Sequence, residues 1–232
     1  MLTVRSIRAG YDESMVLNDV SIQAEIGKVT AVLGRNGVGK STLIKTIAGL
    51  LKPAAGSVEW MGGKIEKKPP ELRARSGIAY VPQGREIFPA LTVEENLLLG
   101  LEALPKKERN GLPDQIFDWF PVLRQMMHRK GGDLSGGQQQ QLAIARAIVG
   151  KPKMLLLDEP MEGIQPSIVQ LIQDVIIDIA SKQKMGIVLV EHSLDLAFAC
   201  ADYYYILDHG MIVNEGVTDI TQKDVVKQHL VV

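Results

Sequence analysis

Features that would place a chain in a membrane or outside the cell are missing from this sequence. Its one cysteine, Cys200, cannot form an internal disulfide bond, which fits a reducing compartment. Arg5, Arg8 and Asp12 interrupt the N-terminus before the apolar stretch of a signal peptide could form. No segment approaches the run of about 18 apolar residues that a membrane-spanning helix needs. We therefore expect a cytosolic chain that does not cross a membrane by itself, which leaves room for a peripheral role.

An excess of charge of one sign is missing as well. Lys and Arg total 26 and Asp and Glu total 27, which gives a formal net charge of −1. Nucleic acids are usually held by a strongly basic face, so this balance gives no reason to expect such a partner, although it permits a local basic patch. Internal repeats and low-complexity stretches are also absent from the sequence. At 232 residues the chain is long enough for one large domain without a stabilising disulfide or metal.

What the sequence does contain is an alternation of short strands with helices, which is typical of an α/β fold. Most of the later strand segments are continuous apolar runs, as expected for strands buried on both faces of a parallel sheet. An antiparallel sheet is expected before this alternation begins, and a mostly helical stretch at 92–149 interrupts the alternation. The expected strands are 2–8, 16–24, 28–33, 57–60, 64–66, 77–81, 154–157, 187–190 and 203–207, and the expected helices include 40–51, 69–76, 166–182 and 194–201.

A glycine-rich loop joins the expected strand at 28–33 to the expected helix at 40–51. Glycines let the backbone curl around phosphate groups, so that backbone N–H groups and the helix N-terminus face the anion. Lys40 would reach the β- and γ-phosphates of a nucleotide, and Ser41 would coordinate Mg²⁺. A plain glycine-rich turn is the alternative, but the strand–loop–helix context is the one that the pattern GxxxxGK[ST] requires. The loop consists of Gly34, Arg35, Asn36, Gly37, Val38, Gly39, Lys40, Ser41 and Thr42.

Two carboxylates end the apolar strand at 154–157. Enzymes with such a phosphate-binding loop (P-loop) need an acid at a neighbouring strand end to hold Mg²⁺, and Asp158 fits this role. Glu159 can then polarise the attacking water as a general base. Alone, an apolar run followed by Asp-Glu often marks a strand that meets a surface turn. Beside a P-loop, the catalytic interpretation is favoured.

A second anion-binding pattern precedes a helix that we expect to run to about residue 149. The N–H groups at that helix N-terminus would point at an anion, and a Ser-Gly helix cap is the plainer alternative. With one P-loop and one such pattern, a face-to-face dimer would give each site a P-loop from one copy and this pattern from the other. The pattern is Leu134, Ser135, Gly136, Gly137 and Gln138.

Together the two motifs resemble those of the nucleotide-binding subunit of an ATP-binding cassette (ABC) transporter, and the resemblance covers essentially the whole chain. It implies a P-loop NTPase core of the RecA-like α/β class with an N-terminal antiparallel β subdomain and an inserted α-helical subdomain. Residues 1–232 would then form a single nucleotide-binding domain. Residues 1–85 would hold the β subdomain and the first part of the core, 86–150 the helical subdomain, and 151–232 the second part of the core.

Three further positions match the resembled family. Tyr11 stands where an aromatic ring stacks on adenine. Gln83 stands where a glutamine touches Mg²⁺ and the attacking water and links the core to the helical subdomain. His192 stands where a histidine contacts the γ-phosphate. The family's cofactors, ATP and Mg²⁺, are therefore expected here.

One segment departs from the family pattern at the expected dimer seam. Gln165 stands where an aspartate is usual, which puts a charged cross-dimer contact in doubt. Met161 is larger and less polar than the usual Ser or Thr. Because Glu159 and His192 are both present, we still expect an active ATPase.

The resemblance extends to one branch of transporters. Residues 81–96 resemble the ATPases of hydrophobic amino-acid and amide importers, and residues 162–166 look most like the urea-type branch. This implies an ATPase that powers import of branched-chain amino acids, urea or a related small amide, at the cytoplasmic face of the inner (plasma) membrane. Implied partners are a second ATPase subunit (a copy or a relative), membrane-spanning permease subunits and, through the assembly, a substrate-binding protein, with no nucleic acid. Phe88, Pro89 and Leu91 are candidates for the groove where the permease docks, or equally for the core of the helical subdomain.

Other classes share parts of this pattern. An ABC exporter would carry the same motifs. A nucleic-acid maintenance ATPase places a long coiled coil between the two halves, whereas only about 50 residues without sustained heptads separate Gln83 from Leu134 here. A nucleotide-gated binding module would not need Glu159, and a P-loop kinase would have no role for the 134–138 pattern or His192.

Overall fold

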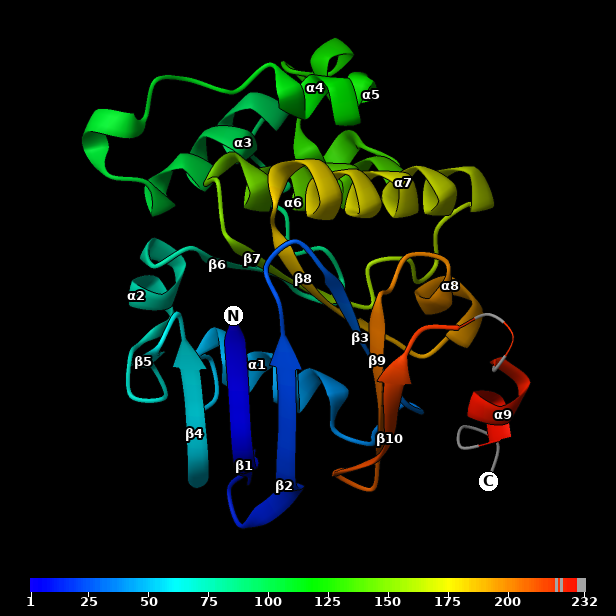
Figure 1. The fold of residues 1–232 in the computed structure, drawn as a ribbon. Coiled ribbons are helices and arrows are strands. Elements are labelled where there is room, and N and C mark those ends of the chain that lie inside the picture. Colours follow the sequence, from blue (N-terminus) through cyan, green and yellow to red (C-terminus); the bar gives the residue numbers. More distant parts are fainter. Residues whose placement is uncertain (220, 222, 229–232) are drawn as a thin grey trace.

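The computed structural model describes residues 1–219, 221 and 223–228, and it contains two sheets with a helix between them (Figure 1). The smaller sheet is antiparallel and has the strand order β2-β1-β4-β5. Leu2 to Ala9 of β1 alternate irregularly between buried and exposed positions, as expected for a sheet with one face on the core. Its strands are β1 (Leu2–Tyr11), β2 (Ser14–Ala24), β4 (Ala55–Trp60) and β5 (Gly63–Lys64).

The larger sheet has the strand order β10-β9-β3-β8-β7-β6 and is parallel except for the β10–β9 pair. Every residue of its three central strands β3, β8 and β7 is buried, which explains their continuous apolar runs. Its strands are β3 (Val29–Leu33), β6 (Ile78–Val81), β7 (Met154–Asp158), β8 (Gly186–Glu191), β9 (Tyr203–Asp208) and β10 (Met211–Val217).

Helix α1 (Lys40–Ala48) forms the layer between the two sheets. Its Leu43, Ile44 and Ile47 belong to one buried cluster with apolar side chains of both sheets. Helices α6 (Gly136–Val149) and α7 (Pro166–Gln183) cover the other face of the parallel sheet and belong to a second cluster. The short helix α2 (Pro70–Arg75) lies beside the edge strand β6, whereas α8 (Leu194–Phe198) packs against β8 and β3. Val226 of the short helix α9 (Lys223–Gln228) joins the same buried cluster as α8. The α/β P-loop architecture expected from the sequence is confirmed.

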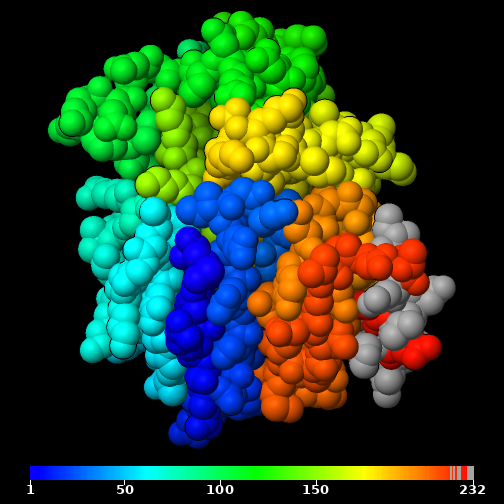
Figure 2. Space-filling model, viewed as in Figure 1, coloured from blue at the N-terminus to red at the C-terminus, as the bar shows by residue number. Residues whose placement is uncertain are grey.

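The mostly helical stretch forms a layer of its own above the sheets, green in Figures 1 and 2. It holds α3 (Val93–Gly100), α4 (Gln115–Trp119), α5 (Pro121–Gln125) and the start of α6, joined by short 3₁₀ turns. These elements fall inside the expected 86–150 subdomain, whose boundaries stay a prediction, as do those of 1–85 and 151–232. None of the helices within the described part of the chain is long and apolar enough to span a membrane.

The structure corrects several expected element ends. The helix expected at 40–51 stops at Ala48 because Gly49 adopts a left-handed backbone (φ 87°) and its N–H caps the carbonyls of Lys45 and Thr46. The helix expected at 194–201 ends at Phe198. Strand β10 was not expected at all, because its alternation of exposed and half-buried side chains at the sheet edge lacks the apolar run used to find the others.

Candidate active site

The predicted P-loop lies between β3 and α1, at the carboxyl end of the parallel sheet. Gly37 (φ 84°) and Gly39 (φ 113°) have left-handed backbones that only glycine adopts readily, and a side chain at Gly37 would project into open space. Gly39 is the N-cap of α1 and, having no side chain, gives the first turn of that helix no side-chain cap. The uncapped N-terminus and the open side of the loop fit a phosphate group.

Lys40 is held at the centre of this loop. Its side chain is 4% exposed, and its ammonium donates to the carbonyl oxygens of Gly34 and Arg35, both at 2.9 Å. The same nitrogen lies 3.2 Å from Oε1 of Glu159, whose side chain is 5% exposed. A buried ion pair of this kind offsets the cost of removing both charges from water. Lys40 is therefore already positioned, with a carboxylate where an anion would bind.

Asp158 and Ser41 form the second part of the site. The Ser41 hydroxyl donates to Oδ1 of Asp158 at 3.1 Å, and the Tyr80 hydroxyl donates to Oδ2 at 3.3 Å. Burial raises the pKa of Asp158, and these two hydrogen bonds oppose the rise. The adjacent oxygens of a hydroxyl and a carboxylate are the ligands Mg²⁺ prefers, since Mg²⁺ takes few protein ligands and completes its shell with phosphates and water. The residues present therefore fit Mg²⁺.

Gln83 reaches the same place from the loop after β6. Its Nε2 donates to Oε2 of Glu159 at 3.1 Å and to Oε2 of Glu162 at 2.9 Å. Glu159 itself has a left-handed backbone (φ 48°), which is strained for a residue with a side chain and is typical of functional positions. The carboxylate of Glu159 thus contacts both the P-loop lysine and the Gln83 amide.

These side chains converge on one cavity of about 360 Å³. Larger hollows exist elsewhere on the molecule, but this one is bounded by the P-loop. Its lining residues are Val16, Asn36, Gly37, Gly39, Lys40, Ser41, Thr42, Gln83 and Glu159. The structure therefore brings together most of the P-loop, the Gln83 loop and the second acidic residue, as the sequence predicted.

Several predicted site residues do not line this cavity, and Tyr11 and His192 are the two whose expected nucleotide contacts lie outside the P-loop, the Asp158 strand end and the 134–138 pattern. Tyr11 ends β1 and is 46% exposed, so its ring is available at the surface. His192 follows β8 directly, and its imidazole is 45% exposed, with Nδ1 3.9 Å from Oε2 of Glu191. Their contacts with adenine and the γ-phosphate stay predictions.

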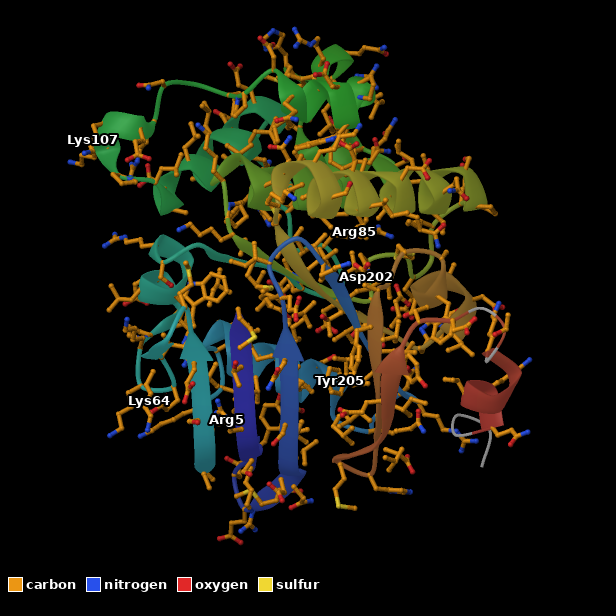
Figure 3. All side chains as sticks on the ribbon, in the orientation of Figure 1. Arg5, Lys64, Arg85, Lys107, Asp202 and Tyr205 are labelled. Carbon is orange, nitrogen blue, oxygen red and sulfur yellow. The ribbon has the colours of Figure 1, made fainter. Side chains whose placement is uncertain are left out.

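The 134–138 pattern lies at the N-terminus of α6, away from the P-loop cavity. Ser135 caps the helix in a reciprocal pair: its hydroxyl accepts from the N–H of Gln138 at 3.4 Å, and its own N–H donates to Oε1 of Gln138 at 2.8 Å. Arg85, labelled in Figure 3, lies against Gly136, and its Nη1 donates to Oε1 of Gln139 at 3.4 Å. A Cβ at Gly137 would meet Ile168 of α7 at 3.1 Å. The plainer helix-cap interpretation is thus realised, and the anion-binding role stays a prediction.

Three residues of the site were not found from the sequence: Tyr80, Glu162 and Glu191. Tyr80 is half-buried in β6, and its hydroxyl bonds to Asp158 at the end of the neighbouring strand, β7. Glu191 ends β8, is fully buried and accepts a hydrogen bond from the N–H of Met161 at 3.3 Å. Glu191 could have been found by the signal that found Asp158, an acidic residue at the end of an apolar strand. Met161 is 3% exposed and packs in the core, whereas Gln165 is exposed at the N-cap position just before α7.

The comparisons with known proteins agree with this geometry. The family described as ABC transporter matches residues 17–162. The chain is 41% identical over 219 residues to the probable branched-chain amino acid transport ATP-binding protein LivF of Archaeoglobus fulgidus, covering 94% of this chain and 93% of that protein. It is 38% identical to the high-affinity branched-chain amino acid transport ATP-binding protein BraG of Pseudomonas aeruginosa, covering 92% and 91%.

A solved structure gives the same result for the fold. The dimeric structure of a post-hydrolysis state of an ATP-binding cassette bound to ADP and Pi superposes with a TM-score of 0.84 at 26% identity, covering 94% of this chain and 99% of that one. Motifs, fold and relatives agree. The chain belongs to the ABC transporter family and is an ATP-hydrolysing subunit.

Proposed function

We propose that the P-loop cavity binds the triphosphate of ATP together with Mg²⁺ and that Glu159 activates the attacking water. The observation that carries this proposal is the convergence of Lys40, Ser41, Gln83 and Glu159 on one cavity beside a glycine-rich helix N-terminus. On binding, Lys40 exchanges Glu159 for phosphate oxygens, because both compete for the same ammonium. Glu159 is then free to accept a proton from water.

Ser41, Asp158 and Gln83 are the proposed Mg²⁺ ligands. The first two supply the oxygens that lie 3.1 Å apart, and Gln83 approaches from its own loop. When bound, Mg²⁺ neutralises charge that develops on the phosphates. Little covalent chemistry is required of the protein, so the positions of these side chains and their electrostatic effects carry the rate.

We propose a second ATPase subunit as the partner that completes the site. Ser135, Gly136, Gly137 and Gln138 lie outside the P-loop cavity of their own chain, so a facing subunit would supply them. A dimeric cassette with the same fold supports this arrangement. In the working assembly the facing subunit is a second copy of this chain or a related ATPase, and Tyr11 and His192 contact adenine and the γ-phosphate.

Permease subunits would dock in a hollow of about 570 Å³ between the core and the helical layer. Exposed apolar side chains line it, among them Leu50 (57% exposed), Phe88 (50%) and Leu99 (42%). Pro89 and Leu91, the other two candidates from the sequence, do not line it. Pro89 instead lies against Gly132. Docking here would place the chain peripherally at the cytoplasmic face of the membrane.

The transported solute is proposed to be a branched-chain amino acid, urea or a related small amide, taken up through a substrate-binding protein. Two relatives named for branched-chain amino acid transport support the amino-acid branch. Uptake of labelled leucine and labelled urea by cells lacking this chain separates the solutes. The proposal fails if neither uptake drops when the chain is removed, or if a hydrolysis-deficient variant restores the lost uptake fully.

The catalytic assignment is tested by Glu159→Gln. We expect phosphate release to fall about 10²–10⁴-fold, because the amide cannot act as a general base. Affinity for ATP, measured by calorimetry, should be retained. Glu108→Gln, an exposed change on a 3₁₀ turn of the helical layer, is the matched control and should leave both unchanged. Undiminished phosphate release from Glu159→Gln would refute the role given to Glu159.

A further inference from the structure

Glu191, the last residue of β8, carries a buried carboxyl group that the proposed reaction does not use. Its side chain is 0% exposed, and His192 follows it directly. A buried carboxyl group costs free energy unless it is hydrogen-bonded, so its presence beside the active site needs a physical explanation.

The bonds of this carboxyl group lead to the turn that follows Glu159. The N–H of Glu159 donates to the carbonyl oxygen of Val190 at 3.0 Å. Pro160 has no N–H, so the next donor along the chain is the N–H of Met161, in a residue that is 3% exposed. That N–H donates to Oε1 of Glu191 at 3.3 Å. The turn is therefore anchored to the end of β8 at two points, one backbone bond and one side-chain bond.

These two hydrogen bonds hold the strained residue Glu159 and the turn that follows it. Glu159 has φ 48°, and such a conformation persists only where the surroundings hold it. The turn closes on itself through the N–H of Glu162, which donates to the carbonyl of Glu159 at 3.3 Å. Its geometry sets where the Glu159 carboxylate meets Lys40 and Gln83.

The second oxygen of Glu191 has no hydrogen-bond partner among the described residues. Charged and titratable groups around it are Glu159, Lys40, His192 and, from the side of α8, Cys200. Burial raises the pKa of Glu191 to about 7, the hydrogen bond from Met161 opposes the rise, and the charge of Glu159 adds to it. Oε1 of Glu191 can accept the hydrogen bond from Met161 whether or not the carboxyl group carries a proton on its other oxygen.

We infer that Glu191 is a positioning residue for ATP hydrolysis, because its side chain holds the strained turn that aims Glu159 into the cavity and joins that turn to the strand end that carries His192. This inference rests on the proposed role of Glu159. It assigns Glu191 no contact with the nucleotide.

Two substitutions distinguish the role of the acceptor oxygen of Glu191 from the role of the rest of its side chain. Glu191→Gln keeps an oxygen that can accept from Met161, so kcat for phosphate release should stay within a few-fold of the wild type. Glu191→Leu has no acceptor, and a displaced general base should lower kcat about 10–10²-fold. KM and the calorimetric affinity for ATP should change little in either variant. Glu191→Met, with an unbranched side chain, replaces the leucine variant if that one does not fold.

Gln173→Leu is the matched control for a merely structural effect. Gln173 is 6% exposed on α7, and its Nε2 donates to the carbonyl of Leu196 at 3.1 Å, away from the cavity. The inference is overturned if Glu191→Leu loses no more kcat than Gln173→Leu at a similar loss of thermal stability, or if glutamine fails as badly as leucine. Glu159→Gln, assayed in parallel, tests the proposed function separately, because wild-type activity there would refute that role instead.

Discussion

The two anion-binding motifs of this chain differ in what surrounds them. At the P-loop, Lys40, Asp158 and Glu159 are all less than a tenth exposed and bonded to one another or to the loop. At the N-terminus of α6, Ser135 is exposed and bonds only within its own helix end. The first motif is a site whose chemistry is assembled by one chain, and the second is presented at the surface. This difference gives the physical reason why the chain should work as a pair.

Of the changes predicted here, replacing Lys40, the buried cation of the P-loop, should have the largest effect. Lys40→Met is expected to lower phosphate release by about 10²–10³-fold or more, because it removes the main electrostatic partner of the phosphates. It also leaves Glu159 buried without its ion-pair partner, which should lower the free energy of unfolding by about 3–5 kcal/mol.

The double variant Lys40→Met with Glu159→Gln sharpens this test. Because the amide carries no charge, urea unfolding should show much of the lost stability restored, while phosphate release stays low. If the single variant is as stable as the wild type, the Lys40–Glu159 pair does not hold the resting site as described.

Mixing two inactive variants tests whether the motif at Ser135 completes the P-loop site of a facing subunit. Ser135→Arg should block the surface motif, and Lys40→Met blocks the P-loop, so each alone should hydrolyse ATP poorly. In a mixed pair, one of the two shared sites has both motifs intact, and phosphate release should reappear on mixing. Absence of any recovery, with both variants folded and paired, would contradict a shared site.

The capping role of Ser135 needs its own control in that experiment. Thr92 caps α3 with the same reciprocal bonds to Glu95. Thr92→Ala should cost about 1 kcal/mol of stability, as loss of a helix cap usually does, without affecting hydrolysis. Equal losses of activity from Thr92→Ala and Ser135→Ala would mean that the motif acts only as a cap.

A pH dependence of stability is expected at the buried site. In the folded chain the pKa of Glu191 is raised to about 7 from an ordinary value of 4.5. Between these values the folded state keeps a proton that the unfolded state releases, so stability is fully present below about pH 4.5 and falls as the pH rises through about 7. The loss is on the order of 3 kcal/mol.

Comparison with Glu191→Gln isolates this contribution, since the glutamine side chain does not titrate. Asp158, whose pKa is raised by burial, titrates in both proteins and cancels in the difference. Urea unfolding from pH 4.5 to 8 should show the wild type losing stability relative to the variant. Parallel curves would show that the folded state does not perturb Glu191.

The sequence predicted the elements that rest on local patterns. The P-loop at 34–42 and the acids after 154–157 depend on neighbours in the chain, and the structure places them as expected. Apolar runs located the buried strands β3, β7 and β8, because burial on both faces leaves no polar positions. Strand β10 escaped because an edge strand with one exposed face has no such run.

Residues that act across the fold were not found in this way. Tyr80, Glu162 and Glu191 lie on segments far from one another in the sequence, and each is linked to the site by one side-chain hydrogen bond. Phe88, Pro89 and Leu91, close together in the chain, were all candidates for the permease groove, yet only Phe88 lines it. Neighbouring residues in a loop point in different directions, and only the packing of helices against the core decides which one faces the hollow.

By itself, the sequence determined the fold class and nominated the groups proposed to bind and hydrolyse a nucleotide, through its motifs and its buried strand runs. Tertiary structure alone decided how those groups are paired in the resting site. It joined Lys40 to Glu159 and brought Glu191 beneath the turn after Glu159, because register between parallel strands sets which strand ends meet. It also separated the P-loop from Ser135, and that separation makes a second subunit part of the proposed site.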